Sequence, residues 1–382
     1  MKKVYLDSAA TTQIRDEVID RMSTVMKDNF GNPSSTHSYG RSSKTLVEQA
    51  RKTVASWLNV SASEIIFTSG GTEADNLVLN SAVRDLGVRR IITSRIEHHA
   101  VLYTVEQLQR SFGIEVRYVK LDEKGNVFLD DLEHLLAASE EKTLVSLMHV
   151  NNEIGNKIDL KKVAEICKTN NALFHSDTVQ SVGHYQLDLK EIPIDFLAAS
   201  AHKFHGPKGV GFAFIRKNSG LKPLIFGGEQ ERGHRAGTEG VHNIVGLEEA
   251  IEISYNNLEK EKAEVLALKK HFIETLKAEI PGVKFNGNCE DPESSTYTLI
   301  NICLPVSSEK ALMLLFQLDL KGIACSKGSA CQSGSSKESH VLSAFLAEED
   351  LVKPSIRFSF SKYNTKEEMD YVVQVLKEFI EA

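Results

Sequence analysis

The stretch DFLAASAHKFHGPKGVGFAFI, residues 195–215, consists of two short apolar runs joined by a polar turn. The runs at 195–199 and 210–215 are rich in aliphatic and aromatic residues, which is typical of buried strands. Similar runs lie at 90–94, 115–120, 143–150 and 172–175. Helical periodicity separates most of them, for example at 72–86 and 160–169. This alternation predicts an α/β domain with a mostly parallel sheet that helices cover on both faces.

The sequence changes in character near residue 250. A long charged helical pattern, two strand-like segments and two further helical patterns follow, at 256–280, 296–304, 355–360, 309–320 and from 366 onward. Such a mixture predicts a smaller α+β domain. We therefore expect a large domain at 1–250, whose N-terminal residues pack against a small domain at 251–382.

The composition indicates a protein that acts on small molecules. Its 382 residues carry a formal net charge of -7 without any run of Lys or Arg, so neither nucleic acid nor an anionic membrane is an expected partner. No segment approaches about 18 uninterrupted apolar residues, and the N-terminus lacks the apolar core of a signal peptide. The five cysteines form no CxxC pair, which favours reduced thiols and a cytoplasmic location.

The segment FTSGGTEADN, residues 67–76, joins a strand end to a helix start through small residues. Thr72 is the expected N-cap, and the free amides and positive end of a helix N-terminus suit a phosphate group. The segment lacks the GK[ST] ending of a P-loop, so an ordinary N-cap turn remains the alternative interpretation.

Two polar side chains follow buried strands. Lys203 comes after the strand at 195–199, and Asp177 comes after the strand at 172–175. A lysine held among histidines and apolar residues can form a Schiff base with an aldehyde cofactor. Asp177 alone would be an ordinary helix N-cap, although the carboxyl ends of α/β strands are where ligands bind. A phosphate seat, a Schiff-base lysine and an anion for a ring nitrogen are together what pyridoxal phosphate requires.

Ten motifs of the chain occur in the order seen in cysteine desulfurases. They are YLDSAATT, NPSSTH, FTSGGTEADN, EHHAVL, HVNNEIG, HSDTVQSVG, SAHKFHGPKGVG, GGEQERGHRAGTEG, GSACQSG and SIRFS. Over essentially its whole length the chain resembles this family of pyridoxal-phosphate enzymes within the class V aminotransferase group. The resemblance implies an enzyme that takes sulfur from L-cysteine and releases L-alanine.

The resemblance implies a role for each matching residue. Lys203 would form the Schiff base and take the α-proton, Asp177 would pair with the pyridinium nitrogen, and His98 would stack on the ring. Arg357 would hold the substrate carboxylate with Asn152, although Arg357 alone would be taken for a structural ion pair. The other implied cofactor contacts are Asn152 and Gln180 near the ring hydroxyl, Gly71, Thr72, Ser200 and His202 at the phosphate, and Thr238, which would reach the phosphate across a homodimer interface.

Cys331, in the motif GSAC, matches the catalytic cysteine of the family. The run of small residues around it, 325–334, predicts a mobile surface loop. The resemblance implies that its thiolate attacks the substrate sulfur and passes the resulting persulfide to a protein acceptor, which is an iron–sulfur cluster scaffold or a sulfur carrier. A free thiol with a pKa of about 8.5 is mostly protonated at neutral pH, so some activation of Cys331 is expected.

Several positions depart from the family pattern. Glu229 replaces a glycine near the expected dimer interface, Lys362 stands where an arginine is frequent, and Cys325 stands where a small residue is usual. Cys325 is a second sulfur relay, a redox partner of Cys331 or an inert thiol. The chain stops soon after its last helix, at Ala382, without the extended tail that some members use to dock a scaffold, so the sulfur acceptor stays open.

Other classes of protein fit parts of the sequence. A selenocysteine lyase or another class V enzyme would share Lys203 and Asp177. A metal hydrolase could use a set of six residues that lacks a recognisable ligand spacing, namely His98, His99, His175, Asp177, His202 and His205. We expect no metal, because the nearby lysine would then have no role. A non-catalytic scaffold is disfavoured, since no catalytic position is missing.

Overall fold

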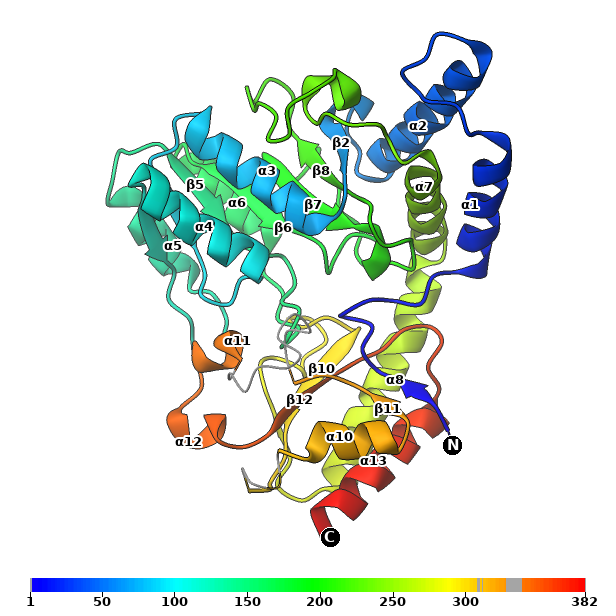
Figure 1. Cartoon of the computed structure of the whole chain (residues 1–382). Helices are drawn as coiled ribbons and strands as arrows, with labels where there is room; N and C mark the ends of the chain where they lie inside the picture. Colours follow the sequence, from blue (N-terminus) through cyan, green and yellow to red (C-terminus); the bar gives the residue numbers. More distant parts are fainter. Residues whose placement is uncertain (1, 308–309, 311, 328–338, 382) are drawn as a thin grey trace.

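The computed structural model describes residues 2–307, 310, 312–327 and 339–381. A seven-stranded sheet forms the centre of its larger part (Figure 1). The strand order is β2-β8-β7-β6-β5-β3-β4, and β8 is antiparallel to both of its neighbours whereas the other pairs are parallel. The strands are β2 (Ile65–Thr68), β3 (Arg90–Thr93), β4 (Glu115–Tyr118), β5 (Thr143–Ser146), β6 (Leu173–Asp177), β7 (Phe196–Ser200) and β8 (Gly211–Ile215). The mostly parallel sheet expected from the sequence is confirmed.

Helices cover both faces of this sheet, because successive residues of a strand point to opposite sides. In β7, Phe196 and Ala198 pack in one apolar core with α3 (Gly71–Arg84) and α4 (His99–Phe112). Leu197 and Ala199 belong to a second core on the other face. The helices that contribute to that second core include α1 (Asp16–Asp28), α2 (Ser38–Trp57), α5 (Leu129–Ala137), α6 (Leu160–Thr169) and α7 (Val241–Asn256).

A smaller α+β part follows α7. Its antiparallel sheet has the order β12-β10-β9 and packs against α8 and α13 (Figure 1). The first strand of the chain, β1 (Val4–Tyr5), pairs in parallel with β11 (Ile323–Ala324), so the N-terminal residues lie in this part. The remaining elements of this part are α8 (Leu258–Glu279), β9 (Lys284–Phe285), β10 (Leu299–Cys303), α10 (Leu314–Leu320), β12 (Ser355–Ser359) and α13 (Lys366–Glu381).

Two one-turn helices near the C-terminus have no counterpart among the expected elements. They are α11 (His340–Ser343) and α12 (Glu348–Leu351), and α11 packs on residues of the larger part. Short 3-10 turns occur at Ala62–Glu64, Ala201–Lys203 and Gln230–Gly233. Among the described helices, none has the length and apolar character that crossing a membrane requires.

Candidate active site

A cavity opens at the carboxyl ends of β6 and β7. The cavity is lined by Ala9, Ala10, Gly71, Thr72, Asp75, His98, Met148, Asn152, Asp177, Val179, Gln180, Ser200, His202, Lys203 and Arg357. Ten of the twelve residues predicted for the site therefore lie around one cavity. The other two, Thr238 and Cys331, are treated below.

The start of α3 provides a seat for an anion. Gly70 has a φ of 153°, and a Cβ added to Gly71 would lie only 2.4 Å from a methyl carbon of Val179. Both positions therefore favour glycine. The N-cap of α3 is Gly70 and not Thr72 as expected, and Thr72 lies inside the first turn. The first N–H groups of a helix have no partner within it and carry a partial positive charge, which suits a phosphate.

Two buried carboxyl groups, Asp75 and Asp177, line the same cavity as the seat, and Glu97 lies near them. Asp177 ends β6, is 6% exposed, and accepts one hydrogen bond, from the Val179 amide at 2.9 Å. Burial raises the pKa of Asp177, and burial also raises the pKa of Asp75 and Glu97 well above the usual values. A cationic ligand atom would relieve this cost of buried negative charge. The arrangement therefore fits the pyridinium end of pyridoxal phosphate, with the phosphate at α3.

Lys203 lies between this cavity and the N-terminal segment. Its Nζ donates hydrogen bonds to the carbonyl oxygens of Ala9 at 2.5 Å and Ala10 at 2.9 Å. The side-chain amide of Gln180 donates to the same Ala9 oxygen at 2.9 Å. The amine is therefore held at the cavity wall, where it can reach a cofactor aldehyde. We did not predict Ala9 and Ala10 as site residues, although the motif YLDSAATT that contains them carried part of the family resemblance.

His98 caps α4 and lines the cavity. Its Nδ1 accepts a hydrogen bond from the Ala100 amide at 3.1 Å, so the ring caps the helix and also lies at the cavity wall. Burial lowers the pKa of His98 to about 4, and the charges of Lys203 and His340 act in the same direction. The imidazole is therefore neutral near pH 7. A neutral ring can stack on an aromatic cofactor ring without burying a charge.

Several other buried histidines share this property, which predicts loss of stability in acid. Burial lowers the pKa of His149 and His175 to about 3 and the pKa of His202 and His205 to about 4. In the unfolded chain these rings take up protons near pH 6.5, so stability falls as the pH drops from about 6.5 towards 4. The raised pKa values of seven carboxyl groups, among them Asp75, Glu97 and Asp177, act in the opposite sense, against eight histidines whose pKa is lowered.

We therefore expect the melting temperature to fall by several degrees between pH 7 and pH 5 at constant ionic strength. His149→Asn should flatten this dependence, because it removes a ring that is kept neutral by burial. His134→Asn, at an exposed helix position, serves as the control and should leave the dependence unchanged. A melting temperature that stayed constant or rose towards pH 5 would contradict the prediction.

Arg357 is fully buried in β12 and makes two contacts at the cavity. It donates to the backbone oxygen of Asn152 at 2.8 Å and to the Asp7 carboxylate at 2.8 Å. Arg357 therefore forms the structural ion pair that the sequence allowed as an alternative. The same residue also lies at the cavity wall. Because Arg357 lines the cavity, its guanidinium is placed where a substrate carboxylate could bind.

Thr238 lies away from this cavity. It lines a separate hollow with residues of the segments 67–69 and 209–210, next to the Glu231 and Arg235 side chains. Within one copy of the chain, Thr238 is therefore not among the residues that line the cofactor cavity.

The two thiols of the predicted loop differ in what the structure describes. Cys331 lies outside the described residues. Cys325 is packed against the small apolar core, and burial, together with the charge of Asp7, raises its pKa to about 12. A thiol with this pKa is almost fully protonated at neutral pH, which favours the inert role for Cys325.

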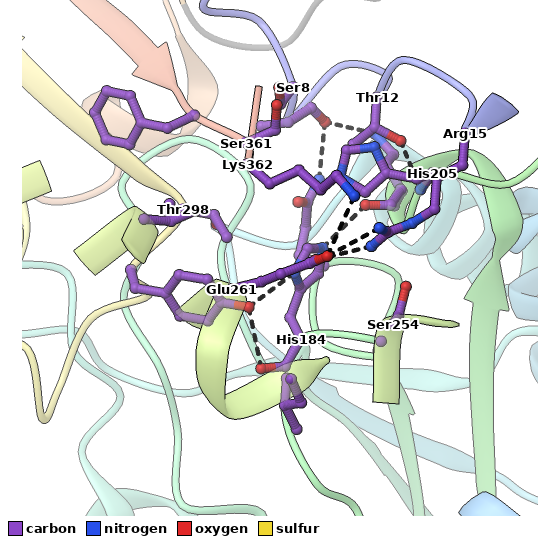
Figure 2. A pocket seen from close by; sticks show the side chains of 18 residues that line it. Ser8, Thr12, Arg15, His184, His205, Ser254, Glu261, Thr298, Ser361 and Lys362 are labelled. Carbon is purple, nitrogen blue, oxygen red and sulfur yellow. Dashed lines mark hydrogen bonds and ion pairs between the residues drawn. The ribbon is translucent and has the colours of Figure 1, made fainter. Parts of the chain in front are cut away.

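A second, polar cavity lies behind Lys203, where the N-terminal segment, the larger part and the smaller part meet (Figure 2). The fully buried Arg15 donates two hydrogen bonds to the Glu261 carboxylate, at 2.9 and 2.8 Å, and Lys362 Nζ lies 3.4 Å from the same carboxylate. Lys362, the departure from the family pattern, thus takes part in an ion cluster. The His184 ring contacts the Lys203 backbone oxygen at 2.9 Å, which braces the turn that carries the lysine.

This cluster predicts a strong effect of one substitution on stability. Glu261→Ala leaves the Arg15 guanidinium buried without its carboxylate, and we expect a loss of about 3 kcal/mol in the free energy of unfolding. Urea denaturation measures the difference. Glu259→Ala, at an exposed position of the same helix, is the control and should stay within about 0.5 kcal/mol of the wild type. Equal stabilities of the two variants would show that the cluster contributes nothing.

The site and the fold can now be compared with known proteins. The profile of the class-V aminotransferase family matches residues 4–372. The cysteine desulfurase IscS of Dictyoglomus turgidum is 42% identical over 382 residues, which covers all of this chain and 95% of that protein. The putative cysteine desulfurase IscS 1 of Bacillus subtilis is 43% identical over 373 residues, which covers 97% of this chain and 96% of that protein.

Solved structures agree with the sequence comparison. A NifS-like protein superimposes with a TM-score of 0.90 and 36% identity over the full length of both chains. A structure of SspA in complex with cysteine gives a TM-score of 0.81 and 30% identity, covering 95% of this chain and all of that one. The chain therefore belongs to the class-V aminotransferase family, whose cysteine desulfurases depend on pyridoxal phosphate. Within the family it is one of the cysteine desulfurases, which confirms the resemblance carried by the ten motifs.

Proposed function

We propose that this enzyme removes sulfur from L-cysteine, releases L-alanine and carries the sulfur as a persulfide on Cys331. The observation that carries the proposal is the convergence of Lys203, Asp177 and the start of α3 on one cavity that Arg357 also lines. These groups meet three separate needs, which are an amine for the aldehyde, an anion for the ring nitrogen and a seat for the phosphate.

Each described residue then has a definite task. Thr72, Ser200 and His202 hold the phosphate with the Gly71 amide, Asp177 holds the ring nitrogen, and His98 and Gln180 fix the ring. When bound, pyridoxal phosphate accepts electron density from the substrate carbon skeleton. Lys203 moves the α-proton, since its amine lies at the cavity wall. Arg357 and Asn152 orient the amino acid through its carboxylate.

The sulfur transfer needs no external oxidant or reductant. The Cys331 thiolate forms a bond to the substrate sulfur while the bond between that sulfur and the substrate Cβ breaks. The electron pair of the broken bond stays on the carbon side, and protonation of Cβ completes the methyl group of alanine. One cysteine and one enzyme thiol thus give one alanine and one enzyme persulfide.

Turnover of two substrates tests this proposal against its nearest alternative. The holoenzyme is incubated with L-cysteine or L-selenocysteine and a thiol reductant, and alanine is measured with sulfide or selenide. We expect equal amounts of alanine and sulfide from L-cysteine. A protein that released alanine from L-selenocysteine alone would be a selenocysteine lyase, and one that released none would belong to another class V activity.

A homodimer forms part of the same proposal. Thr238 can contact the phosphate only from a second copy, and exposed aromatic residues, Phe30 and Phe226, are available for an interface. We expect a dimer in sedimentation at micromolar concentration, and Thr238→Val should weaken cofactor retention about tenfold. A fully active monomer would remove the assignment of Thr238.

The proposal also includes the protein that accepts the sulfur. A protein acceptor, either an iron–sulfur cluster scaffold or a sulfur carrier, would take it from Cys331. A cytoplasmic location belongs to the same proposal, because a persulfide formed on a free thiol is compatible with reducing surroundings.

A further inference from the structure

The turn that carries Lys203 is held from outside through its backbone oxygens. The carbonyl oxygens of residues 202–205 each accept a hydrogen bond from another part of the chain. The donors are the Thr12 amide and hydroxyl for His202, the His184 ring for Lys203, the Ser254 hydroxyl for Phe204 and the Arg15 amide for His205. His205 has a φ of 67°, which is uncommon for a residue other than glycine, so these bonds stabilise a strained backbone.

The His184 ring is the donor that contacts Lys203 itself. Its Nε2 lies 2.9 Å from the Lys203 backbone oxygen, and a carbonyl oxygen can only accept, so Nε2 carries the hydrogen. The preceding residue, Gly183, has a φ of 80°, and a Cβ added to it would lie 2.5 Å from the Cβ of Phe204. The close approach of the two turns therefore favours glycine at position 183.

Tyr297 holds the other nitrogen of the His184 ring. Its hydroxyl lies 3.1 Å from His184 Nδ1. Burial lowers the pKa of His184, so the ring is neutral near pH 7, and Nδ1 carries no hydrogen when Nε2 carries one. The Tyr297 hydroxyl therefore donates to Nδ1, while Nε2 donates to the Lys203 oxygen. The two hydrogen bonds run in one direction, from Tyr297 through His184 to the lysine turn.

The two residues belong to different parts of the molecule. His184 lies between β6 and β7 of the larger part. Tyr297 lies two residues before β10, is 6% exposed and packs in the apolar core of the smaller part. Both line the polar cavity behind Lys203 (Figure 2). Neither is among the described residues that line the cofactor cavity.

We propose that His184 and Tyr297 are positioning residues for Lys203, through which the smaller part holds the turn that carries the amine. This inference rests on the proposed function, in which Lys203 moves the α-proton. Such a transfer is sensitive to the position of the base, because the reacting atoms must lie about 3–3.5 Å apart. The pair acts on the backbone of Lys203, so it should affect reactions of the amine more than binding of the amino acid.

Four variants test this role. His184→Leu removes the ring donor, whereas His184→Gln keeps an N–H donor of similar reach. Tyr297→Phe removes only the hydroxyl. Tyr185→Phe is the matched control, because the Tyr185 hydroxyl donates to Thr296 Oγ1 at 3.0 Å. This bond also joins the larger part to the smaller one, but it does not lie on the path from Tyr297 to Lys203.

Two rates report on the amine of Lys203. The first is the rate at which the visible imine band appears when the apoenzyme is mixed with saturating pyridoxal phosphate, which needs no substrate. The second is the exchange of the α-hydrogen of L-alanine in D₂O, followed by NMR, which needs Lys203 but no sulfur transfer. The affinity for L-alanine is measured separately from the change in cofactor absorbance.

We expect both rates to be about tenfold lower in His184→Leu and about fivefold lower in Tyr297→Phe. The affinity for L-alanine should stay within about twofold of the wild type, because the substrate contacts are unchanged. His184→Gln should recover both rates to within about threefold of the wild type. Tyr185→Phe should behave like the wild type.

Unchanged rates in His184→Leu or in Tyr297→Phe overturn the proposal. An equal loss in Tyr185→Phe also overturns it, because any contact between the two parts would then have the same effect. If His184→Leu does not fold, the comparison of Tyr297→Phe with Tyr185→Phe decides, since each removes a single hydroxyl.

Failure of the proposed function gives a different result. A wild-type enzyme that exchanged the α-hydrogen of L-alanine but released no sulfur from L-cysteine would lack the proposed activity, and both rates would still test the positioning. If the wild type exchanged no α-hydrogen, the rate of imine formation alone would decide: a slower rate in Tyr297→Phe supports the proposal, and an unchanged rate rejects it.

Discussion

Cys331→Ser is expected to abolish sulfur release while cofactor and L-cysteine binding stay intact. The hydroxyl of serine is far less ionised than a thiol and is a poor nucleophile towards sulfur, so turnover should fall by at least about a hundredfold. The residues that we propose to hold the cofactor belong to other segments, since Lys203, Asp177 and the start of α3 all line the cavity. The visible spectrum and its response to L-cysteine should therefore match those of the wild type.

The control for this experiment is the neighbouring thiol. Cys325→Ser should keep most of the activity, because burial raises the pKa of Cys325 to about 12 and leaves it protonated. Sulfide release with L-cysteine, measured for both variants at the same cofactor content, distinguishes the two thiols. Full activity of Cys331→Ser, combined with an inactive Cys325→Ser, would show that Cys325 and not Cys331 is the nucleophile.

Lys203→Ala is expected to remove both the covalent attachment of the cofactor and the group that moves the α-proton. The visible absorption of the lysine–cofactor imine should disappear, and sulfur release should fall by at least about a thousandfold, since two chemical roles are lost at once. The wild-type protein should lose its visible band on treatment with borohydride, which reduces the imine and fixes the cofactor to Lys203.

Lys208→Ala provides the matched control, because Lys208 lies in the turn after Lys203 and is exposed. This variant should keep the visible band and the activity. Mass spectrometry of the borohydride-treated wild type identifies the modified lysine directly. A cofactor attached to any residue other than Lys203, or a visible imine band that persisted in Lys203→Ala, would show that the amine has been assigned wrongly.

The fold could be predicted from the sequence to the extent that apolar runs determine it. All eight expected strand segments contain a strand, because buried strands need continuous apolar residues that are visible in the sequence. The strand ends differ from the expected ones, since the apolar run at 143–150 continues past β5, which ends at Ser146. The one-turn helices α11 and α12 were not expected, because so few residues show no helical period.

The site was predicted through motifs, and the structure adds the contacts that motifs cannot show. The carbonyl oxygens of Ala9 and Ala10 hold Lys203, yet their side chains carry no chemical signal. The pairing of Arg15 with Glu261 joins residues 246 positions apart, which only the folded chain brings together. The expected N-cap at Thr72 is wrong, because the helix begins at Gly71 and its N-cap is Gly70. The backbone of Gly70 has a φ that favours glycine. The motif match assigned Thr238 to the phosphate, whereas within one chain Thr238 lines a separate hollow.

A single-turnover experiment with the wild-type holoenzyme tests the central claim most directly. One equivalent of L-cysteine is added without a reductant, alanine is quantified, and every cysteine peptide is examined by mass spectrometry for an added sulfur atom. The proposed function predicts equal amounts of alanine and of persulfide, with the sulfur on Cys331. Alanine formed without a persulfide on Cys331, or sulfur found on Cys325 instead, would contradict it.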